Sequence, residues 1–259
     1  MALDHVDAVL LDIDGVLVTS WQALPGAIET VGWLRAHELG FRLITNTTTH
    51  TREDLARTLA EAGFEVRVDE IVTAVVATAS YLRANHAGNK VYVLSDGDGT
   101  GDLEGVELVT TPEDADVMVL GGACDAFSYA TVNRVFRRVR DGAVLVGMHR
   151  NLFWKTADGW ELDGGAYIAG IEAAADVTAA ICGKPAPEYF EAALRLLGVS
   201  AGRVLMVGDD ITNDVLGAQA AGISGVLVRT GKFTPDSLRR GTPDHVIDSI
   251  ADLPTLLKA

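Results

Sequence analysis

Short apolar runs alternate with stretches of helical periodicity along most of the chain, and this alternation constrains the fold more than any other feature. In the first third, one apolar run ends at Asp12 and another spans residues 41–45, and helical patterns follow at 28–39 and 52–62. In the last third we expect strands at 204–207, 225–228 and 246–247 and helices at 187–197, 213–221 and 250–257. Strands separated by helices favour a parallel sheet covered on both faces, so the sequence predicts an α/β fold.

The middle of the chain, from about residue 74 to residue 180, has an alternation of its own. We expect a helix up to residue 84 and another at 129–140, with strands at 90–94, 116–120 and 143–146. A self-contained α/β insert of this length predicts a second domain placed within the first. The expected division is a core of residues 1–73 and 181–259 with an inserted domain of residues 74–180.

Composition and charge exclude several classes of protein. The 259 residues are 48% hydrophobic and 22% charged, as in a globular protein, and no apolar run approaches the roughly 20 residues of a membrane span. The net charge of −15 argues against nucleic-acid binding, because phosphate backbones require a basic face. The N-terminus lacks the basic region of a signal peptide, and Cys124 and Cys182 are isolated in sequence, so we expect two structural thiols and a cytoplasmic location.

Two aspartates, Asp12 and Asp14, stand one residue apart where the first predicted strand ends. Strand alternation places both side chains on the same side, where like charges repel unless a cation or a raised pKa relieves them. A divalent metal is one relief, and the alternative is an ordinary strand followed by an Asp-Gly turn. An EF-hand loop does not fit, because Val16 and Leu17 occupy positions that need an oxygen ligand and a glycine.

Two later segments place polar side chains next to predicted strands. The strand at 41–45 ends in Thr45, Asn46 and Thr47, whose hydroxyl and amide groups suit phosphoryl oxygens, although such clusters also form ordinary turns. Lys184 stands between a glycine and a proline just before a predicted helix. A lysine fixed in this way is positioned by the chain, unlike an ordinary surface lysine.

The predicted strand at 204–207 leads through Gly208 into three acidic residues, Asp209, Asp210 and Asp214. Capping of the following helix accounts for one or two of them, but hardly for all three. Ligands collect at the carboxyl ends of the strands in an open α/β sheet, which makes these segments candidates for one site.

In this order, the DxDG motif, the Thr/Asn strand end, the GKP motif and the GDDxxxD motif resemble the haloacid dehalogenase superfamily. The match extends over nearly the whole chain, and the insert resembles the large α/β cap of class II members, in the p-nitrophenylphosphatase-like branch. The resemblance implies a Rossmann-like parallel core with an inserted cap domain. It also implies a Mg²⁺-dependent phosphatase that acts on a small phosphorylated compound through an aspartyl-phosphate. The alternative is a phosphate-binding or regulatory protein that keeps this fold without turnover.

The resemblance also implies a role for each motif. Asp12 is expected to be the nucleophile, and Asp14 to protonate the leaving oxygen and then activate water. Mg²⁺ is expected on the Asp12 carboxylate, the Asp14 main-chain carbonyl and Asp209. Lys184 is expected to neutralise the phosphoryl oxygens. The residues expected to hold metal-bound waters and to orient this lysine are Asp210 and Asp214.

Caps of this kind contribute the residues that choose the substrate. By resemblance, residues 148–160 contain a loop facing the active site, with Asn151, Trp154 and Lys155 as candidates, although Trp154 equally fits the core of the cap. The acidic segment 96–107 has the ligand spacing of an EF-hand loop. A strand leads into it where that motif needs a helix, so we expect an exposed acidic turn instead of a calcium site. Relatives in this branch often dimerise through the cap, which makes a homodimer an expectation.

Overall fold

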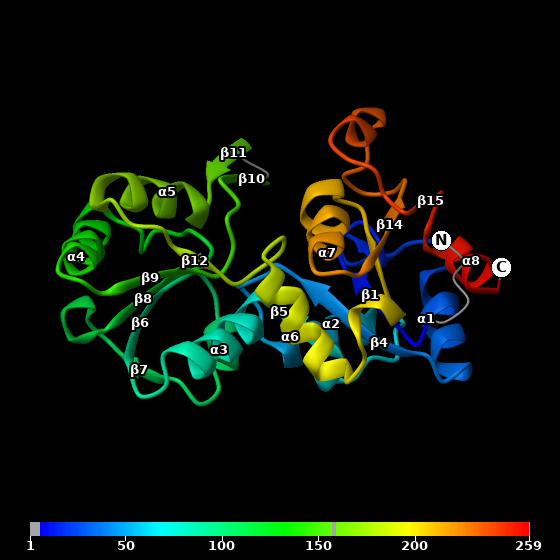
Figure 1. Cartoon of the computed structure of the whole chain (residues 1–259), viewed down its shortest axis with the longest axis horizontal. Coiled ribbons are helices and arrows are strands. Elements are labelled where there is room, and N and C mark those ends of the chain that lie inside the picture. The colour runs from blue at the N-terminus through cyan, green and yellow to red at the C-terminus, as the bar shows by residue number, and fades with distance from the viewer. Residues whose placement is uncertain (1–5, 157–158, 259) are drawn as a thin grey trace. The chain divides into compact units, whose positions relative to one another are not determined.

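A computed structural model describes residues 6–156 and 159–258 of the chain (Figure 1). The chain divides into two compact units, the first made of Met1–Thr45, Arg52–Val72 and Lys184–Ala259 and the second of Asn46–Thr51 and Thr73–Gly183. Each unit contains its own parallel sheet with helices packed against it, so the predicted α/β fold is confirmed. No helix in the described part of the chain is long and apolar enough to cross a membrane.

The first unit is built on a six-stranded sheet with the strand order β15-β14-β13-β1-β4-β5. Its strands are β1 (Ala8–Asp12), β4 (Gly40–Thr45), β5 (Ile71–Thr73), β13 (Val204–Gly208), β14 (Ser224–Val228) and β15 (His245–Ile247). Its α-helices are α1 (Ala27–Ala36), α2 (Arg52–Glu61), α6 (Pro187–Leu197), α7 (Gly217–Ala220) and α8 (Leu253–Lys258). A small hairpin joins β2 (Val18–Thr19) to β3 (Gln22–Ala23), and single 3₁₀ turns cover 68–70, 201–203, 235–239 and 250–252.

The two central strands of this sheet explain why the acidic motifs come together. All five residues of β1 and all five of β13 are buried, as expected for strands covered on both faces. β1 pairs in parallel with β13, and β13 pairs in parallel with β14. Because parallel strands end at the same edge, the loops after β1, β13 and β14 emerge side by side.

The second unit is built on a five-stranded parallel sheet with the order β12-β9-β8-β6-β7. Its strands are β6 (Lys90–Leu94), β7 (Glu107–Val109), β8 (Val117–Leu120), β9 (Val144–Gly147) and β12 (Ala180–Ile181). Its α-helices are α3 (Ala74–Asn85), α4 (Tyr129–Arg140) and α5 (Gly164–Ala175), with 3₁₀ turns at 99–102 and 112–114. Figure 1 shows α4 and α5 beside each other in this unit, and their residues share one hydrophobic cluster with those of β8 and β9.

A pair of strands and a helix of the second unit were not expected. The stretch 148–160, where we expected a loop, contains β10 (Phe153–Thr156) and the start of β11 (Gly159–Leu162), which pair in antiparallel fashion. Helix α5 follows it although its sequence contains three glycines, which disfavour a helix. The Asp163 carboxylate caps α5 by accepting a hydrogen bond from the main-chain NH of Gly164, and Ile168 and Ile171 are buried on its inner face. Capping and burial together therefore outweigh the glycines.

The acidic segment 96–107 is not a simple exposed turn. Asp102 is only 5% exposed, and the main-chain NH of Asp98 donates to the carbonyl oxygen of Thr49. A Cβ atom at Gly97 or Gly99 would lie 2.2 Å or 2.1 Å from a carbonyl oxygen of the 48–49 segment. The two glycines therefore allow main chain to pack on main chain at the start of this segment.

Candidate functional site

The first predicted motif places two aspartates in different surroundings. Asp12 ends β1 and is 5% exposed, whereas Asp14 lies in the following turn with its side chain exposed to solvent. Although Asp14 is exposed overall, partial burial of its carboxyl group raises its pKa. Lys232 and, less strongly, Lys184 oppose that rise. Asp12 is thus enclosed by the protein, and Asp14 is open to solvent and to ligands.

Lys184 is buried between two carboxylates. Its Nζ atom lies 2.7 Å from Oδ1 of Asp12 and 2.7 Å from Oδ1 of Asp214, and its side chain is 4% exposed. Burial alone would lower the pKa of this lysine, but the two carboxylates outweigh it and raise the pKa, so the ammonium group stays charged. The sequence predicted that Asp214 orients Lys184, and the two side chains are in contact.

Asp209 sits in a cradle formed by two glycines. An ideal Cβ atom at Gly15 or at Gly231 would lie 2.0 Å from Oδ2 of Asp209, and both glycines have a positive φ, 81° and 60°. Only glycine fits at either position, because any other residue would collide with the carboxylate and strain the backbone. Oδ2 of Asp209 accepts a hydrogen bond of 2.7 Å from the main-chain NH of Lys232.

The surroundings of the other carboxylate oxygen of Asp209, Oδ1, indicate that it binds a proton or a cation. Oδ1 of Asp209 is buried and has no hydrogen-bond partner among the described residues. Burial, with the charges of Asp12 and Asp214, raises the pKa of Asp209 to about 7. A buried carboxylate oxygen without a donor costs free energy unless a proton or a cation satisfies it.

The cluster fits a divalent metal ion. Asp12, Asp209 and Asp214 each offer one carboxylate oxygen, and these oxygens all lie within 4.8 Å of one another. Burial and the charge of Asp12 raise the pKa of Asp214 to about 6, against the effect of Lys184. A set made only of carboxylate oxygens suits hard divalent cations. Both oxygens of Asp214 have a close contact, Oδ1 with Lys184 and Oδ2 with the main-chain NH of Asp210, whereas Oδ1 of Asp209 has no hydrogen-bond partner among the described residues.

Asp210 acts as a helix cap. Its Oδ1 atom accepts from the main-chain NH groups of Thr212 and Asn213, at 2.9 Å and 3.1 Å. The turn that it caps, Ile211–Leu216, is π-helical and leads into α7, where the sequence predicted one continuous helix. A Cβ atom at Gly208 would lie 2.2 Å from Cβ of Asp214, so glycine allows this turn to fold back on the strand end.

The predicted phosphate-binding and substrate-binding residues fall in both units. Thr45 belongs to the first unit, and its main-chain NH donates to the hydroxyl of the buried Tyr189. The residues that belong to the second unit are Asn46, Thr47, Asn151, Trp154 and Lys155. Asn151 is exposed. Trp154 and Lys155 lie on β10, and their side chains are outside the described residues.

One part of the site was missed in the sequence. The Thr230-Gly231-Lys232 segment follows β14, and the Thr230 hydroxyl donates to the carbonyl oxygen of Gly15. The signal was a polar TGK tripeptide one residue after the end of a buried strand, a pattern similar to that of the other motifs. It could be connected to them only once β14 was known to lie next to β13.

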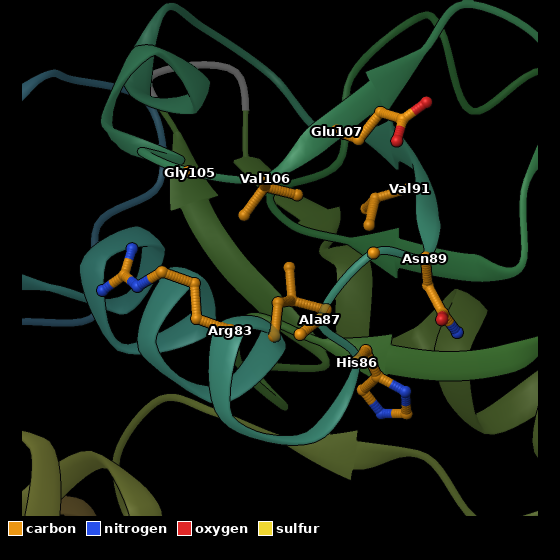
Figure 2. A pocket seen from close by; sticks show the side chains of 10 residues that line it. Arg83, His86, Ala87, Asn89, Val91, Gly105, Val106 and Glu107 are labelled. Atoms are coloured by element: carbon orange, nitrogen blue, oxygen red, sulfur yellow. The ribbon is translucent and has the colours of Figure 1, made fainter.

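A cavity of about 110 Å³ in the second unit is a separate feature. It opens between the end of α3 and the starts of β6 and β7 (Figure 2). Its polar lining side chains, which include Arg83, His86 and Glu107, spread outwards instead of converging. Ligand sites generally place a few polar groups so that they converge on the ligand, so this cavity is not a candidate site.

Comparison with known proteins identifies the family of this chain. Residues 9–109 match the family of haloacid dehalogenase-like hydrolases, and residues 181–253 match a second family described as HAD-hydrolase-like. Human haloacid dehalogenase-like hydrolase domain-containing protein 2 is 35% identical over 226 residues, which are 87% of this chain and 85% of that protein. Phospholysine phosphohistidine inorganic pyrophosphate phosphatase of Xenopus laevis is 33% identical over 263 residues, covering 98% and 95% of the two chains.

The fold comparison reaches the same family. The p-nitrophenyl phosphatase of Archaeoglobus fulgidus superposes with a TM-score of 0.89 at 27% identity, over 96% of this chain and 98% of that chain. The stretches at 124–136 and 180–190 resemble the phospholysine phosphohistidine phosphatases, and the whole-chain similarity to them confirms that resemblance. The protein therefore belongs to the haloacid dehalogenase-like hydrolases, in the p-nitrophenylphosphatase branch of phosphatases.

Proposed function

We propose that the protein is a Mg²⁺-dependent phosphatase that hydrolyses a small phosphorylated compound through an aspartyl-phosphate on Asp12. The observation that carries the proposal is the buried Lys184, whose ammonium group contacts Asp12 at 2.7 Å in the cluster that contains Oδ1 of Asp209, an atom without a hydrogen-bond partner in the described part of the chain. In this proposal, residues 1–73 and 181–259 form the catalytic core and residues 74–180 form the cap.

The first step forms a bond between a carboxylate oxygen of Asp12 and phosphorus while the bond from phosphorus to the leaving oxygen breaks. Lys184 fixes Oδ1 of Asp12 and places a positive charge next to the phosphoryl oxygens. Asp14 gives its proton to the leaving oxygen, and the raised pKa of its carboxyl group favours the protonated form that this role needs.

In the second step Asp14 takes a proton from water, and the resulting nucleophile attacks phosphorus. The bond from phosphorus to Asp12 then breaks, which regenerates the carboxylate and releases phosphate. Asp12 and Asp209, with the main-chain carbonyl of Asp14, would hold Mg²⁺. The bound ion supplies Lewis-acid neutralisation of the phosphoryl charge. Asp210 and Asp214 complete the proposed site by holding metal-bound waters and the lysine.

The names of the relatives support phosphoryl chemistry on small substrates. They include p-nitrophenyl phosphatases and a phosphatase of phospholysine, phosphohistidine and inorganic pyrophosphate. We therefore propose phosphate esters, pyrophosphate and phosphorylated amino acids as the first substrates to assay. The competing function is that of a phosphate-binding or regulatory protein without turnover, and the retained Asp12, Asp14 and Lys184 argue against it.

Hydrolysis of 4-nitrophenyl phosphate with and without Mg²⁺ tests the proposal. We expect turnover with Mg²⁺ and a fall of about 100-fold or more after chelation, because removal of the cation exposes the phosphoryl charge to the carboxylates. Release of 4-nitrophenolate measures the rate. No turnover by folded, Mg²⁺-loaded protein would favour the binding function.

Metal binding should depend on pH through Asp209. Its pKa of about 7 in the metal-free fold lies above the usual value of 3.8, so the folded carboxyl binds its proton more tightly than the unfolded one. This group therefore lowers the stability of the metal-free protein as the pH rises from about 4 through 7. Because Mg²⁺ binds the ionised carboxylate, Mg²⁺ should raise Tm more at pH 8 than at pH 5.5.

At a Mg²⁺ concentration about 100 times the dissociation constant, the stabilisation is about 2.7 kcal/mol, which corresponds to roughly 5–10 °C in Tm. Differential scanning calorimetry of chelated and Mg²⁺-loaded protein at the two pH values measures it. Asp209→Asn should lose the shift, and Asp7→Asn should keep it, because Asp7 forms an exposed ion pair with Arg203. An equal shift in wild type and Asp209→Asn would remove Asp209 from the metal site.

Two further expectations belong to this proposal. Both cysteines, Cys124 and Cys182, are free thiols, which is compatible with the proposed cytoplasmic location. A homodimer formed through the cap also stays a prediction, and light scattering of the purified protein measures it directly.

A further inference from the structure

We propose that Lys232 binds an anionic substituent on the leaving group, so that the enzyme prefers phosphorylated compounds that carry a second negative charge. This inference rests on the proposed function, because it assigns a substrate class to the same site. Lys232 lies in the segment after β14 that the sequence analysis did not single out.

The main chain of Lys232 is fixed at the site. Its NH group donates to Oδ2 of Asp209 at 2.7 Å, and the neighbouring Thr230 hydroxyl donates to the carbonyl oxygen of Gly15. An ideal Cβ at Gly231 would lie 2.7 Å from the Cα atom of Gly15, so the two loops are in close contact. The root of the Lys232 side chain is therefore positioned by the same contacts that hold the proposed metal ligand.

The ammonium group of Lys232, in contrast, is available to a ligand. Its side chain is 66% exposed, and its Nζ atom lies 3.9 Å from Oδ2 of Asp210, which is beyond hydrogen-bond distance. Among the described residues, no hydrogen bond holds this ammonium group. Lys184 differs because it is 4% exposed and contacts two carboxylates at 2.7 Å. The charge of Lys184 is therefore paired with buried carboxylates, whereas the charge of Lys232 faces solvent.

Lys232 lies on the leaving-group side of the proposed reaction. Asp14, which gives its proton to the leaving oxygen, is followed directly by Gly15, and Gly15 contacts Thr230 and Gly231, the two residues before Lys232. A second anionic group on the leaving group would meet this ammonium group next to the acid. In a protein with a net charge of −15, such a group would find little other attraction. Carboxylate and phosphate substituents share this chemistry.

A pair of matched substrates tests the inference. The leaving group of 4-carboxyphenyl phosphate carries an extra negative charge, and that of 4-carbamoylphenyl phosphate is neutral and of nearly equal size. The ratio of their kcat/KM values is measured in wild type and in Lys232→Met, and comparison of the two ratios cancels the intrinsic reactivity of the substrates. We expect the ratio to fall about five- to tenfold in Lys232→Met, mainly through KM of the charged substrate.

Two variants and one condition separate binding from a structural effect. Lys232→Arg should keep the ratio, because it keeps the charge. Lys258→Met should also keep it, because that lysine lies over the ring of Trp33, with 5.3 Å between Nζ and the ring centroid. Raising the salt concentration should lower the wild-type ratio and leave the Lys232→Met ratio unchanged, since salt screens exposed charges.

The outcomes distinguish this inference from the proposed function. An unchanged ratio in Lys232→Met, or an equal loss for both substrates, would overturn the inference while the phosphatase proposal stands. A wild-type protein that hydrolyses neither substrate nor 4-nitrophenyl phosphate would overturn both. A third substrate, 1,4-phenylene bisphosphate, identifies the anion: a larger loss with it than with the carboxylate assigns a second phosphate, and the reverse assigns a carboxylate.

Discussion

Replacement of Asp12 by asparagine should lower kcat by about four orders of magnitude or more, because the amide cannot form the aspartyl-phosphate. The side chain keeps its size, and Lys184 keeps its second carboxylate partner, Asp214, at 2.7 Å. The variant should therefore fold. Loss of one of three clustered negative charges also relieves repulsion with Asp209, so we expect no fall in Tm.

Steady-state hydrolysis of 4-nitrophenyl phosphate measures this loss, and rapid acid quenching with radiolabelled phosphate substrate traps the intermediate. Wild type should show a protein-bound label that hydroxylamine releases, and Asp12→Asn should show none. Asp7→Asn is the matched control, because it makes the same chemical change five residues earlier, in an exposed ion pair with Arg203. Full activity in Asp12→Asn would rule out the covalent mechanism.

Replacement of Lys184 by methionine should affect both stability and turnover. The change leaves Asp12 and Asp214 as buried carboxylates without their shared cation, which costs about 3–5 kcal/mol of unfolding free energy. A loss of this size lowers Tm by roughly 6–20 °C. Turnover should fall by about 1,000-fold or more, because the charge next to the transferred phosphoryl group is lost.

The loss of stability in Lys184→Met should shrink as the pH falls. Burial already raises the pKa of Asp214 to about 6, and protonation of this carboxyl removes the unpaired charge. Tm measured at pH 5 and pH 8, against wild type at the same pH, should show the larger difference at pH 8. Lys258→Met is the control and should change stability by about 1 kcal/mol or less, because it loses only one cation–π contact. Equal losses in the two variants would show that Lys184 has no special electrostatic role.

The regular elements could be predicted where local pattern and burial agree. The predicted helices at 187–197 and 129–140 and the predicted strand at 90–94 have the bounds of α6, α4 and β6. The two helices combine a clear period with a local start signal, a proline in the first turn of α6 and Ser128 before α4, whose side chain accepts from the main-chain NH of Thr131. Helix α5 and the β10–β11 hairpin were missed, because the glycines of the helix and the short strands of the hairpin give weak local signals.

The candidate site could be predicted in part for the same reason. Asp12 ends a buried strand, Asp209 and Asp214 follow another, and Lys184 lies just before a helix; the structure brings all four together in the first unit. Asp210 was assigned a part in metal binding, and its observed contacts are those of a helix cap, which was also considered. Lys232 was missed, because the sequence around a lysine that follows a strand does not indicate which groups its side chain will lie near in the folded protein.

The sequence by itself determined the parallel α/β fold and the acidic strand ends, because apolar runs that are buried on both faces are a local property of the chain. The tertiary structure decided which strand ends meet. It brought Lys184 to Asp12 across 172 residues, and it placed the carboxylate of Asp209 between Gly15 and Gly231. Such contacts depend on strand order. Strand order is fixed by packing over the whole sheet, and the local periodicity of the sequence does not reveal it.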